Sequence, residues 1–202
     1  MAELAAARLY LVTDAAPGEQ LLRAALEGGV DVVQLREKHA SDDEIIAAAD
    51  LFRRLCDEYG ATFVLNDRAD LARAAHADGV HVGQEDEPVA SMRERLGPDV
   101  VIGLSTHSPE QLEAALATDA DYVCVGPVYA TPTKPDYEEV GLDLVRRAAA
   151  TADRPWFAIG GIDGSNVREV AEAGAERVAV VRAIRDATDP KAAAEELRSG
   201  LE

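Results

Sequence analysis

Short runs rich in Val, Ile and Leu recur along this chain, and each is followed by a longer stretch whose apolar residues repeat every three or four positions. The first pattern is typical of a buried parallel strand, and the second is typical of an amphipathic helix. Eight such pairs follow one another. The predicted strands are Arg8–Thr13, Asp31–Leu35, Thr62–Leu65, Gly79–Val82, Val101–Leu104, Asp121–Val125, Trp156–Ile159 and Arg177–Val181.

A helix is predicted after every strand. The predicted helices are Glu19–Glu27, Asp42–Glu58, Ala69–His76, Pro88–Leu96, Pro109–Ala117, Leu142–Ala150, Asn166–Ala173 and Pro190–Leu201. Serine residues give start signals for three of them, namely Ser41, Ser108 and Ser165. Glycine residues stand where three helices should end, namely Gly60, Gly97 and Gly174.

Eight strand–helix pairs in 202 residues predict a (β/α)8 TIM barrel near the minimum size of that fold. An open doubly wound sheet is the alternative, and eight consecutive units favour the barrel over it. No linker, low-complexity tract or composition shift divides the chain. We therefore expect residues 1–202 to form a single catalytic barrel domain.

The chain is strongly acidic, with 38 Asp and Glu against 20 Lys and Arg and a formal net charge of −18. This balance argues against nucleic acid or an anionic membrane as a partner, because both require a basic face. An acid excess with little Lys is typical of a halophilic-type acidic surface, since the screening length falls to about 3 Å at 1 M salt. An ordinary acidic protein is the alternative interpretation.

Cysteine usage and hydropathy indicate the cellular compartment that we expect for this protein. Cys56 and Cys124 are too few for a disulfide scaffold or a zinc site. The first residues lack the basic segment of a signal peptide, and no apolar run reaches the roughly 20 residues that span a membrane. A cytoplasmic location is therefore expected.

Polar residues follow the second, third and fourth predicted strands, and barrels of this kind carry function at such strand ends. Alternation sends Gln34, Arg36 and Lys38 toward the barrel mouth, although an outward-facing charged strand end is the alternative. Asp67 and Asp86 are expected on adjacent strand ends. Two carboxylates there, completed by waters and substrate phosphates, would suit Mg²⁺, whereas helix N-caps are their alternative role.

The loop after the sixth strand holds Thr131, Thr133 and Lys134, with Pro132 and Pro135 limiting its backbone freedom. Two hydroxyls and an ammonium group in a stiff loop suit a phosphate. The chain has only three lysines, namely Lys38, Lys134 and Lys191. Because lysine is so rare in this chain, Lys134 at this strand end is interpreted as more than a solubilising surface residue. The alternative is an ordinary solvated loop.

The fifth and seventh strands end in further candidates. Ser105 lacks the glycine-flanked elbow of a serine nucleophile and is interpreted as a hydrogen-bond donor to substrate. His107 suits an acid, a base or a solvated loop residue, and His81 is interpreted as structural or as a hydrogen-bonding wall. The Gly160-Gly161 pair allows backbone N–H groups to approach an anion, at a position where barrels commonly bind phosphate.

Seven motifs stand in order at these strand ends: QLREK, LNDR, HVGQED, GLSTHS, VGPVYATPTK, IGGI and VAVVRAI. Together they resemble the thiamine-phosphate synthase family, and the resemblance runs from Leu9 to beyond Ile184. It implies a (β/α)8 barrel that joins a hydroxymethylpyrimidine diphosphate to a thiazole phosphate, releases diphosphate and uses Mg²⁺. The implied partners are small phosphorylated substrates, and a homo-oligomer is one option for the assembly.

The resemblance also implies roles for individual residues. The pyrimidine diphosphate would be bound by Gln34, Arg36, Lys38, Asn66, Ser105 and Lys134. Mg²⁺ would be held by Asp67 and Asp86. The thiazole phosphate would be bound by Thr131, Pro132, Thr133, Gly161 and the backbone of Val181 and Arg182. Many members have Ser where this chain has Arg182, so the role of that side chain stays open.

The implied chemistry is early cleavage of the pyrimidine C–O bond, which gives a carbocation that the thiazole nitrogen attacks. The expected catalytic groups are Arg36, Lys38, Ser105 and Lys134. The cationic ones, with Mg²⁺, would stabilise the departing diphosphate. Two alternatives remain: an isomerase like thiazole tautomerase, with His107 as acid or base, and a non-catalytic barrel that binds a phosphorylated ligand.

Overall fold

Eight parallel strands form a closed barrel in the computed structural model, which describes residues 2–132 and 138–202. Each strand pairs with the next, and β8 pairs with β1. The strands are β1 (Leu9–Thr13), β2 (Val32–Leu35), β3 (Thr62–Asn66), β4 (Gly79–Val82), β5 (Val101–Thr106), β6 (Tyr122–Val125), β7 (Trp156–Ile159) and β8 (Val178–Val180). The predicted strands and the predicted (β/α)8 architecture are confirmed.

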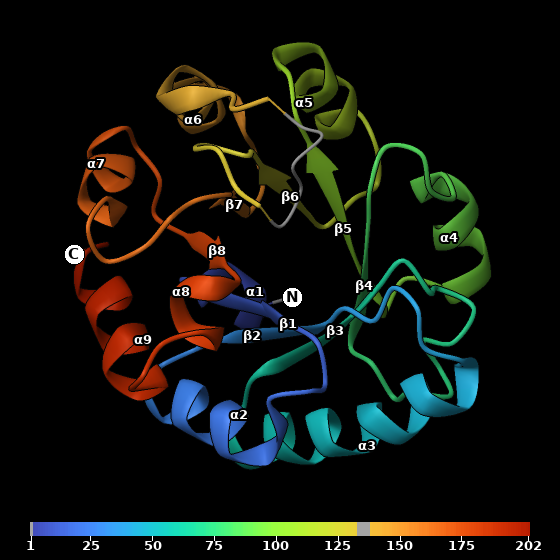
Figure 1. Cartoon of the computed structure of the whole chain (residues 1–202). Helices are drawn as coiled ribbons and strands as arrows, with labels where there is room; N and C mark the ends of the chain where they lie inside the picture. The colour runs from blue at the N-terminus through green and yellow to red at the C-terminus, as the bar shows by residue number, and fades with distance from the viewer. Residues whose placement is uncertain (1, 133–137) are drawn as a thin grey trace.

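Helices surround the barrel, as the view along its axis shows (Figure 1). They are α1 (Ala2–Ala6), α2 (Gly18–Glu27), α3 (Asp42–Tyr59), α4 (Val89–Leu96), α5 (Pro109–Leu116), α6 (Gly141–Thr151), α7 (Val167–Glu172), α8 (Arg182–Arg185) and α9 (Pro190–Ser199). The short helices α1 and α8 were not predicted from the sequence. Within the described ranges, no helix is both long enough and apolar enough to cross a membrane.

Two of the three serine start signals are confirmed as helix caps. The Ser41 hydroxyl accepts a hydrogen bond from the Glu44 amide, and the Glu44 carboxylate accepts one from the Ser41 amide at 2.8 Å. Ser108 caps α5 in a similar way, accepting from the Gln111 amide at 3.2 Å. The prediction for Ser165 is wrong, because its hydroxyl donates instead to the nearby carboxylate of Asp163.

The prediction of a helix over Ala69–His76 is also wrong, because this segment is a series of turns. Its buried alanines recur at intervals of three, at Ala69, Ala72 and Ala75. That spacing fits a chain wound more tightly than an α-helix. The small side chains let the turns pack against the barrel. The Ala-rich pattern therefore indicates burial of this segment and does not indicate a helix.

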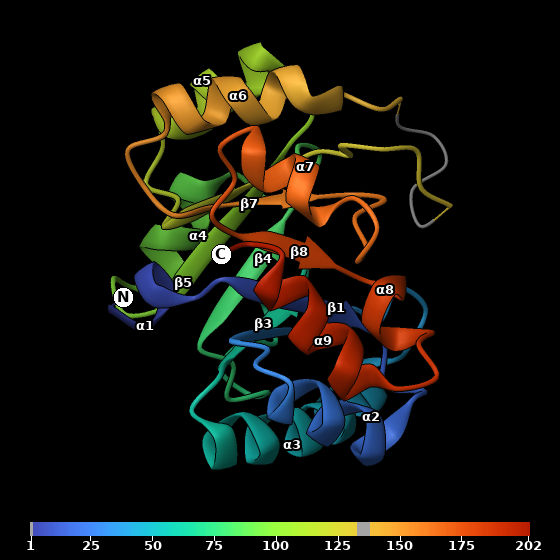
Figure 2. The same cartoon turned by 90° about the vertical axis from the view of Figure 1, so that its left-hand side faces the viewer.

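The strands separate two cores. Alternate residues face outward against the helices, as Leu9 and Leu11 do on β1, while Tyr10 and Val12 face the barrel interior. Leu4 of α1 belongs to the interior cluster, so α1 closes the N-terminal end of the barrel. Figure 2 shows α1 and α8 at opposite ends. The C-terminal ends of the strands are therefore left to form the functional face.

Candidate active site

A cavity of about 610 Å³ lies at the C-terminal ends of the strands. Most of the predicted site residues line it, namely Gln34, Arg36, Lys38, Asn66, Asp67, Asp86, Ser105, Thr131, Gly161, Val181 and Arg182. Pro132 is exposed and is not among the lining residues. Thr133 and Lys134 lie outside the described residues. The structure thus brings together side chains separated by up to about 150 positions in the sequence.

Asp67 directly follows β3, and Asp86 lies in the turn after the paired strand β4; both line the cavity. Burial and the negative charge of Asp86 raise the pKa of the Asp67 carboxyl, whereas Lys38 opposes that rise. The Lys38 Nζ atom lies 3.6 Å from Asp67 Oδ2. The two carboxylates therefore form an electrostatically strained pair that Lys38 relieves only in part.

The backbone fixes both carboxylates. Asp67 has a φ of 60°, and its amide donates to the His81 carbonyl at 2.8 Å. The Gly83 amide donates to Asp86 Oδ2 at 2.7 Å. Such a positive φ is uncommon outside glycine and is tolerated best by Asp and Asn. The turn after β3 thus holds the Asp67 carboxylate at the cavity wall.

This donor set fits a magnesium ion. Mg²⁺ is commonly bound by one or two carboxylates and completes its shell with waters and substrate phosphates. In the described part of the chain, no cluster of three or more His, Cys, Asp or Glu residues could hold a metal alone. A cation bound by Asp67 and Asp86 would therefore need water or substrate oxygens to complete its coordination.

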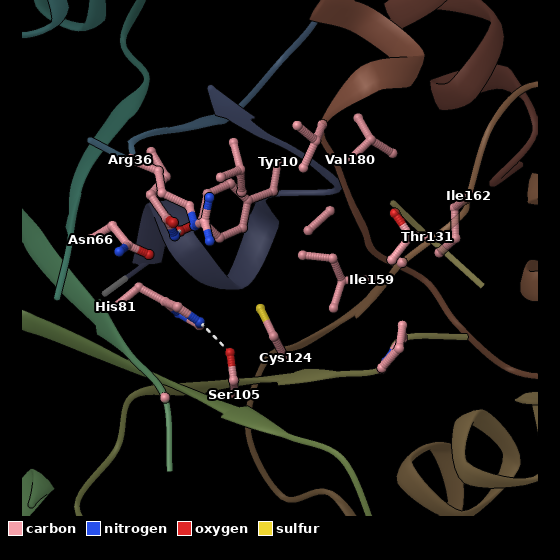
Figure 3. Close-up of a pocket in the computed structure, with 18 of the residues that line it drawn as sticks. Tyr10, Arg36, Asn66, His81, Ser105, Cys124, Thr131, Ile159, Ile162 and Val180 are labelled. Carbon is pink, nitrogen blue, oxygen red and sulfur yellow. Dashed lines mark hydrogen bonds between the residues drawn. The ribbon is translucent and has the colours of Figure 1, made fainter. Parts of the chain in front are cut away.

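A buried hydrogen-bond chain crosses the barrel beneath the cavity. Gln34 Nε2 donates to the Tyr10 hydroxyl at 2.6 Å, and the Tyr10 and Tyr122 hydroxyls lie 2.9 Å apart. The chain continues from Tyr122 to His81 Nδ1 at 3.0 Å and from His81 Nε2 to Ser105 Oγ at 2.9 Å. We call these five residues the relay; Figure 3 marks its last contact.

Sequence reasoning missed two members of the relay. Tyr10 and Tyr122 stand inside apolar strand segments, where they resemble ordinary core residues. The available signal was their chemistry, because a buried tyrosine hydroxyl requires a hydrogen-bond partner. The interpretation of His81 as a structural, hydrogen-bonding wall agrees with its contacts to Tyr122 and Ser105.

The opposite side of the cavity is built from the ends of β7 and β8. Gly160 and Gly161 have φ values of 102° and 67°. A Cβ atom on Gly161 would lie 2.7 Å from the Cβ of Tyr129, so only glycine fits this close approach. Figure 3 shows Thr131 and Ile162 on this side, across the cavity from Arg36 and Asn66.

His107 lines the same cavity, and its position is fixed by two contacts. Its Nδ1 atom contacts the Gly126 carbonyl, and its amide donates to Gln111 Oε1 at 2.7 Å. Contact with a backbone carbonyl is typical of a His with a defined ring orientation. His107 therefore adjoins the cavity as an oriented side chain.

The described lining of the cavity contains more negative than positive side chains. The cations are Arg36, Lys38 and Arg182, and the carboxylates are Asp67, Glu85, Asp86, Asp163 and Asp186. An anionic ligand would therefore gain from an added cation within this cavity.

Comparisons with known proteins agree on one family. A family model described as thiamine monophosphate synthase matches residues 9–184. The thiamine-phosphate synthase of Mycobacterium tuberculosis (strain ATCC 25177 / H37Ra) is 51% identical over 98% of this chain and 96% of its own length. That of Acidothermus cellulolyticus is 54% identical over 99% and 97%. The solved thiamine phosphate pyrophosphorylase from Pyrococcus furiosus superposes with a TM-score of 0.90 at 37% identity, covering 98% of this chain and 96% of that one.

Proposed function

Because this chain belongs to the thiamine monophosphate synthase family, we propose that it joins a 4-amino-2-methyl-5-hydroxymethylpyrimidine diphosphate to a thiazole phosphate. The products are thiamine phosphate and diphosphate, so the reaction is the transfer of a pyrimidinylmethyl group. The observation that carries this assignment is a single cavity with a paired-carboxylate end beside Lys38 and a glycine-built end at Gly161. Two such ends suit two substrates that each carry phosphate.

The diphosphate is assigned to the end formed by β2, β3 and β4. There, Arg36 and Lys38 contribute positive charge, and the sequence adds Lys134. A Mg²⁺ ion held by Asp67 and Asp86 would supply further positive charge to the departing diphosphate. Fixed cations at the place where negative charge develops lower the barrier to C–O cleavage. Arg36, Lys38 and Lys134 therefore serve as the catalytic cations.

The pyrimidine ring is assigned to the middle of the cavity. Gln34, Asn66 and Ser105 are polar, line the cavity and are each at most 8% exposed. Buried polar groups of this kind orient a ligand because they need partners with matching donors and acceptors. These three residues would hold the ring so that its reacting carbon faces the second substrate.

The thiazole phosphate is assigned to the ends of β6, β7 and β8. The proposed contacts are Thr131, Pro132, Thr133, Gly161, Val181 and Arg182. Gly161 supports the assignment because it lines the cavity with a φ of 67°, a conformation that favours glycine, and α8 begins at Arg182. Loops after the seventh and eighth strands, together with a short extra helix, commonly bind phosphate in such barrels.

Two other functions predict different results. An isomerase like thiazole tautomerase would use His107 but would have no diphosphate to release, and a non-catalytic barrel would bind its ligand unchanged. The contact between Asp67 and Asp86 favours the transferase, because neither alternative needs a metal-binding carboxylate pair.

The test is to incubate purified protein with both phosphorylated substrates and measure thiamine phosphate and diphosphate. The transferase predicts that the two products appear in equal amounts. Isomerisation of the thiazole without diphosphate release, or binding without any product, would reject the proposal in favour of one of the alternatives. Folded protein, verified by circular dichroism, is required for each of these outcomes.

A further inference from the structure

The relay is buried, although all of its members except Tyr122 line the cavity. None of its members, Gln34, Tyr10, Tyr122, His81 and Ser105, is more than 8% exposed. Burial raises the pKa of the Tyr10 and Tyr122 hydroxyls well above the ordinary phenol range, so both keep their protons. In a medium of low dielectric constant, neighbouring hydrogen bonds polarise one another. The relay therefore behaves as one connected unit.

One assignment of protons gives the relay a single direction. Each hydroxyl carries one proton, and a neutral imidazole has one donor and one acceptor nitrogen. Gln34 donates to the Tyr10 hydroxyl. In the arrangement that continues this direction, Tyr10 donates to Tyr122, and Tyr122 donates to His81 Nδ1. In that arrangement, a neutral His81 carries its proton on Nε2 and donates to Ser105 Oγ, 2.9 Å away. In this direction each of the four contacts of the relay joins one donor to one acceptor.

This direction determines what the two ends offer to a ligand. The Ser105 oxygen accepts from His81, so its own proton is left for an acceptor in the cavity. The Gln34 amide uses one N–H for Tyr10, which leaves its carbonyl oxygen to accept from a ligand donor and its second N–H to donate. A ring with an amino group and an unprotonated ring nitrogen matches both ends.

The pairing of β5 with β6 fixes the position of Tyr122 in the relay. Gly103 on β5 is the register partner of Tyr122 on β6, and a Cβ atom at Gly103 would overlap the Tyr122 ring. Phe157 packs edge-on against Tyr122 and Tyr10, with ring centroids at 5.7 and 5.2 Å. The tyrosine rings are thus held by packing, and each hydroxyl can be removed without removing its ring.

We propose that the relay sets the hydrogen-bond polarity of the pyrimidine subsite and so selects a ring that carries an amino group beside a ring nitrogen. Tyr122 does not line the cavity and acts as a positioning residue, through Tyr10 and Gln34 on one side and through His81 and Ser105 on the other. This inference rests on the proposed function, which supplies the aminopyrimidine substrate.

The test uses Tyr122→Phe, with Tyr59→Phe as the matched control. Tyr59 lies on α3, and its hydroxyl bonds to Glu27 at 3.3 Å on the outside of the molecule. For each variant, kcat/KM is measured with the aminopyrimidine diphosphate and with an analogue that carries hydrogen in place of the amino group. The ratio of the two values is the selectivity, and KM for the thiazole phosphate is measured in parallel.

Tyr122→Phe should lower kcat/KM for the aminopyrimidine by about 10- to 100-fold, because it leaves buried relay groups without partners. Selectivity should fall by a similar factor, while KM for the thiazole phosphate stays unchanged. Tyr59→Phe should change none of these values. A merely structural role for Tyr122 would instead affect both substrates together or lower stability alone.

Tyr10→Phe removes a hydroxyl at another point of the same relay. If the Tyr122→Phe protein does not fold, the same measurements are made on Tyr10→Phe. The double variant should be no worse than either single variant, because groups in one network are not additive. Folded variants with wild-type selectivity, or with losses that add, would overturn the relay while leaving the proposed function intact.

If folded wild-type protein makes no product, the proposed function fails. The effect of the relay on ligand selectivity is then tested by calorimetry. The two pyrimidine diphosphates are titrated into the wild-type protein and the Tyr122→Phe variant, and the ratio of their affinities replaces the kinetic selectivity. A ratio that falls in the variant supports the relay, and an unchanged ratio overturns it.

Discussion

Lys38 and Asp67 show how single residues in this cavity depend on their neighbours. Their side chains lie 3.6 Å apart, and both are partly exposed, so the ion pair is weak by itself. Burial raises the pKa of the Asp67 carboxyl, and the like charge of Asp86 raises it further. We infer that the pair of carboxylates is arranged to receive a cation, because like charges held together are costly until they are neutralised.

Asp67→Asn tests the metal assignment at the residue scale. Asn tolerates the positive φ at this position, so the turn should be retained while one charge is lost. The Mg²⁺ concentration for half-maximal activity should rise by at least about tenfold, as it does when metal-site residues are altered. Asp70→Asn is the control, because Asp70 pairs with Arg68 outside the cavity lining. An unchanged Mg²⁺ dependence in Asp67→Asn would contradict the assignment.

Lys134→Ala tests the one proposed catalytic cation that lies outside the described residues. If Lys134 stabilises the departing diphosphate, its loss should lower kcat by a factor on the order of 10² to 10³. Lys191→Ala is the matched control, since Lys191 lies on α9 and faces Glu27 at 3.9 Å. Near-normal turnover in Lys134→Ala would show that this lysine does not take part in catalysis.

At the scale of elements, strand ends and their loops determine the geometry of the cavity side to which the thiazole phosphate is assigned. Gly161 and Gly18 have similar φ values, 67° and 72°. A Cβ atom at Gly161 would crowd Tyr129, whereas one at Gly18 would meet nothing within 4 Å. The two glycines therefore separate the effect of backbone strain from the effect of close approach.

Gly161→Ala and Gly18→Ala form a matched pair of variants. Each should lose roughly 1–2 kcal/mol of unfolding free energy from the left-handed backbone. Only Gly161→Ala should also raise KM for the thiazole phosphate, by about tenfold or more, because its loop must shift away from Tyr129. Steady-state kinetics and thermal melting measure the two effects. Equal KM values for the thiazole phosphate in the two variants would show that Gly161 does not take part in binding this substrate.

Elements were predictable from the sequence wherever one local pattern determined the structure. The strands and the cap at Ser41 follow from hydrophobic periodicity and from hydrogen bonds within a few residues. The turns at Ala69–His76 were not predictable, because an Ala-rich stretch has high helix propensity whichever way it packs. The helix α8 is only four residues long, which is too short for a periodic signal.

The candidate site was predictable as a set of strand ends but not as a network. Barrel topology brings Gln34 and Ser105 to one face, so their cavity positions follow from the fold. The link between them runs through Tyr10 on β1 and Tyr122 on β6, which are 112 positions apart. No local pattern reports which core hydroxyls meet across a barrel. The contact between Tyr10 and Tyr122 could be identified only from the structure.

At the scale of the whole molecule, charge sets the conditions under which the cavity can work. A formal charge of −18 repels anionic substrates, and the described cavity lining does not reverse that sign. The screening length is about 10 Å at 0.1 M salt and shortens further at higher concentration. Salt should therefore ease substrate approach and reduce self-repulsion in the folded state.

We accordingly predict that activity and melting temperature both rise as KCl increases from low concentration. Initial rates at subsaturating substrate and melting curves, measured on the same preparation, test this prediction. Sucrose matched for osmolality is the control, since it adds solute without screening charge. Activity that falls steadily from low to high salt would contradict the proposed salt-adapted surface.

The most direct test of the whole account is the rate of thiamine phosphate formation in the presence of Mg²⁺, after chelation, and after Mg²⁺ is restored. The account predicts product with Mg²⁺, loss of nearly all product after chelation, and recovery when the ion is returned. A full rate under chelation would contradict the role assigned to Asp67 and Asp86. No product under any of these conditions, from protein shown to be folded, would contradict the transferase itself.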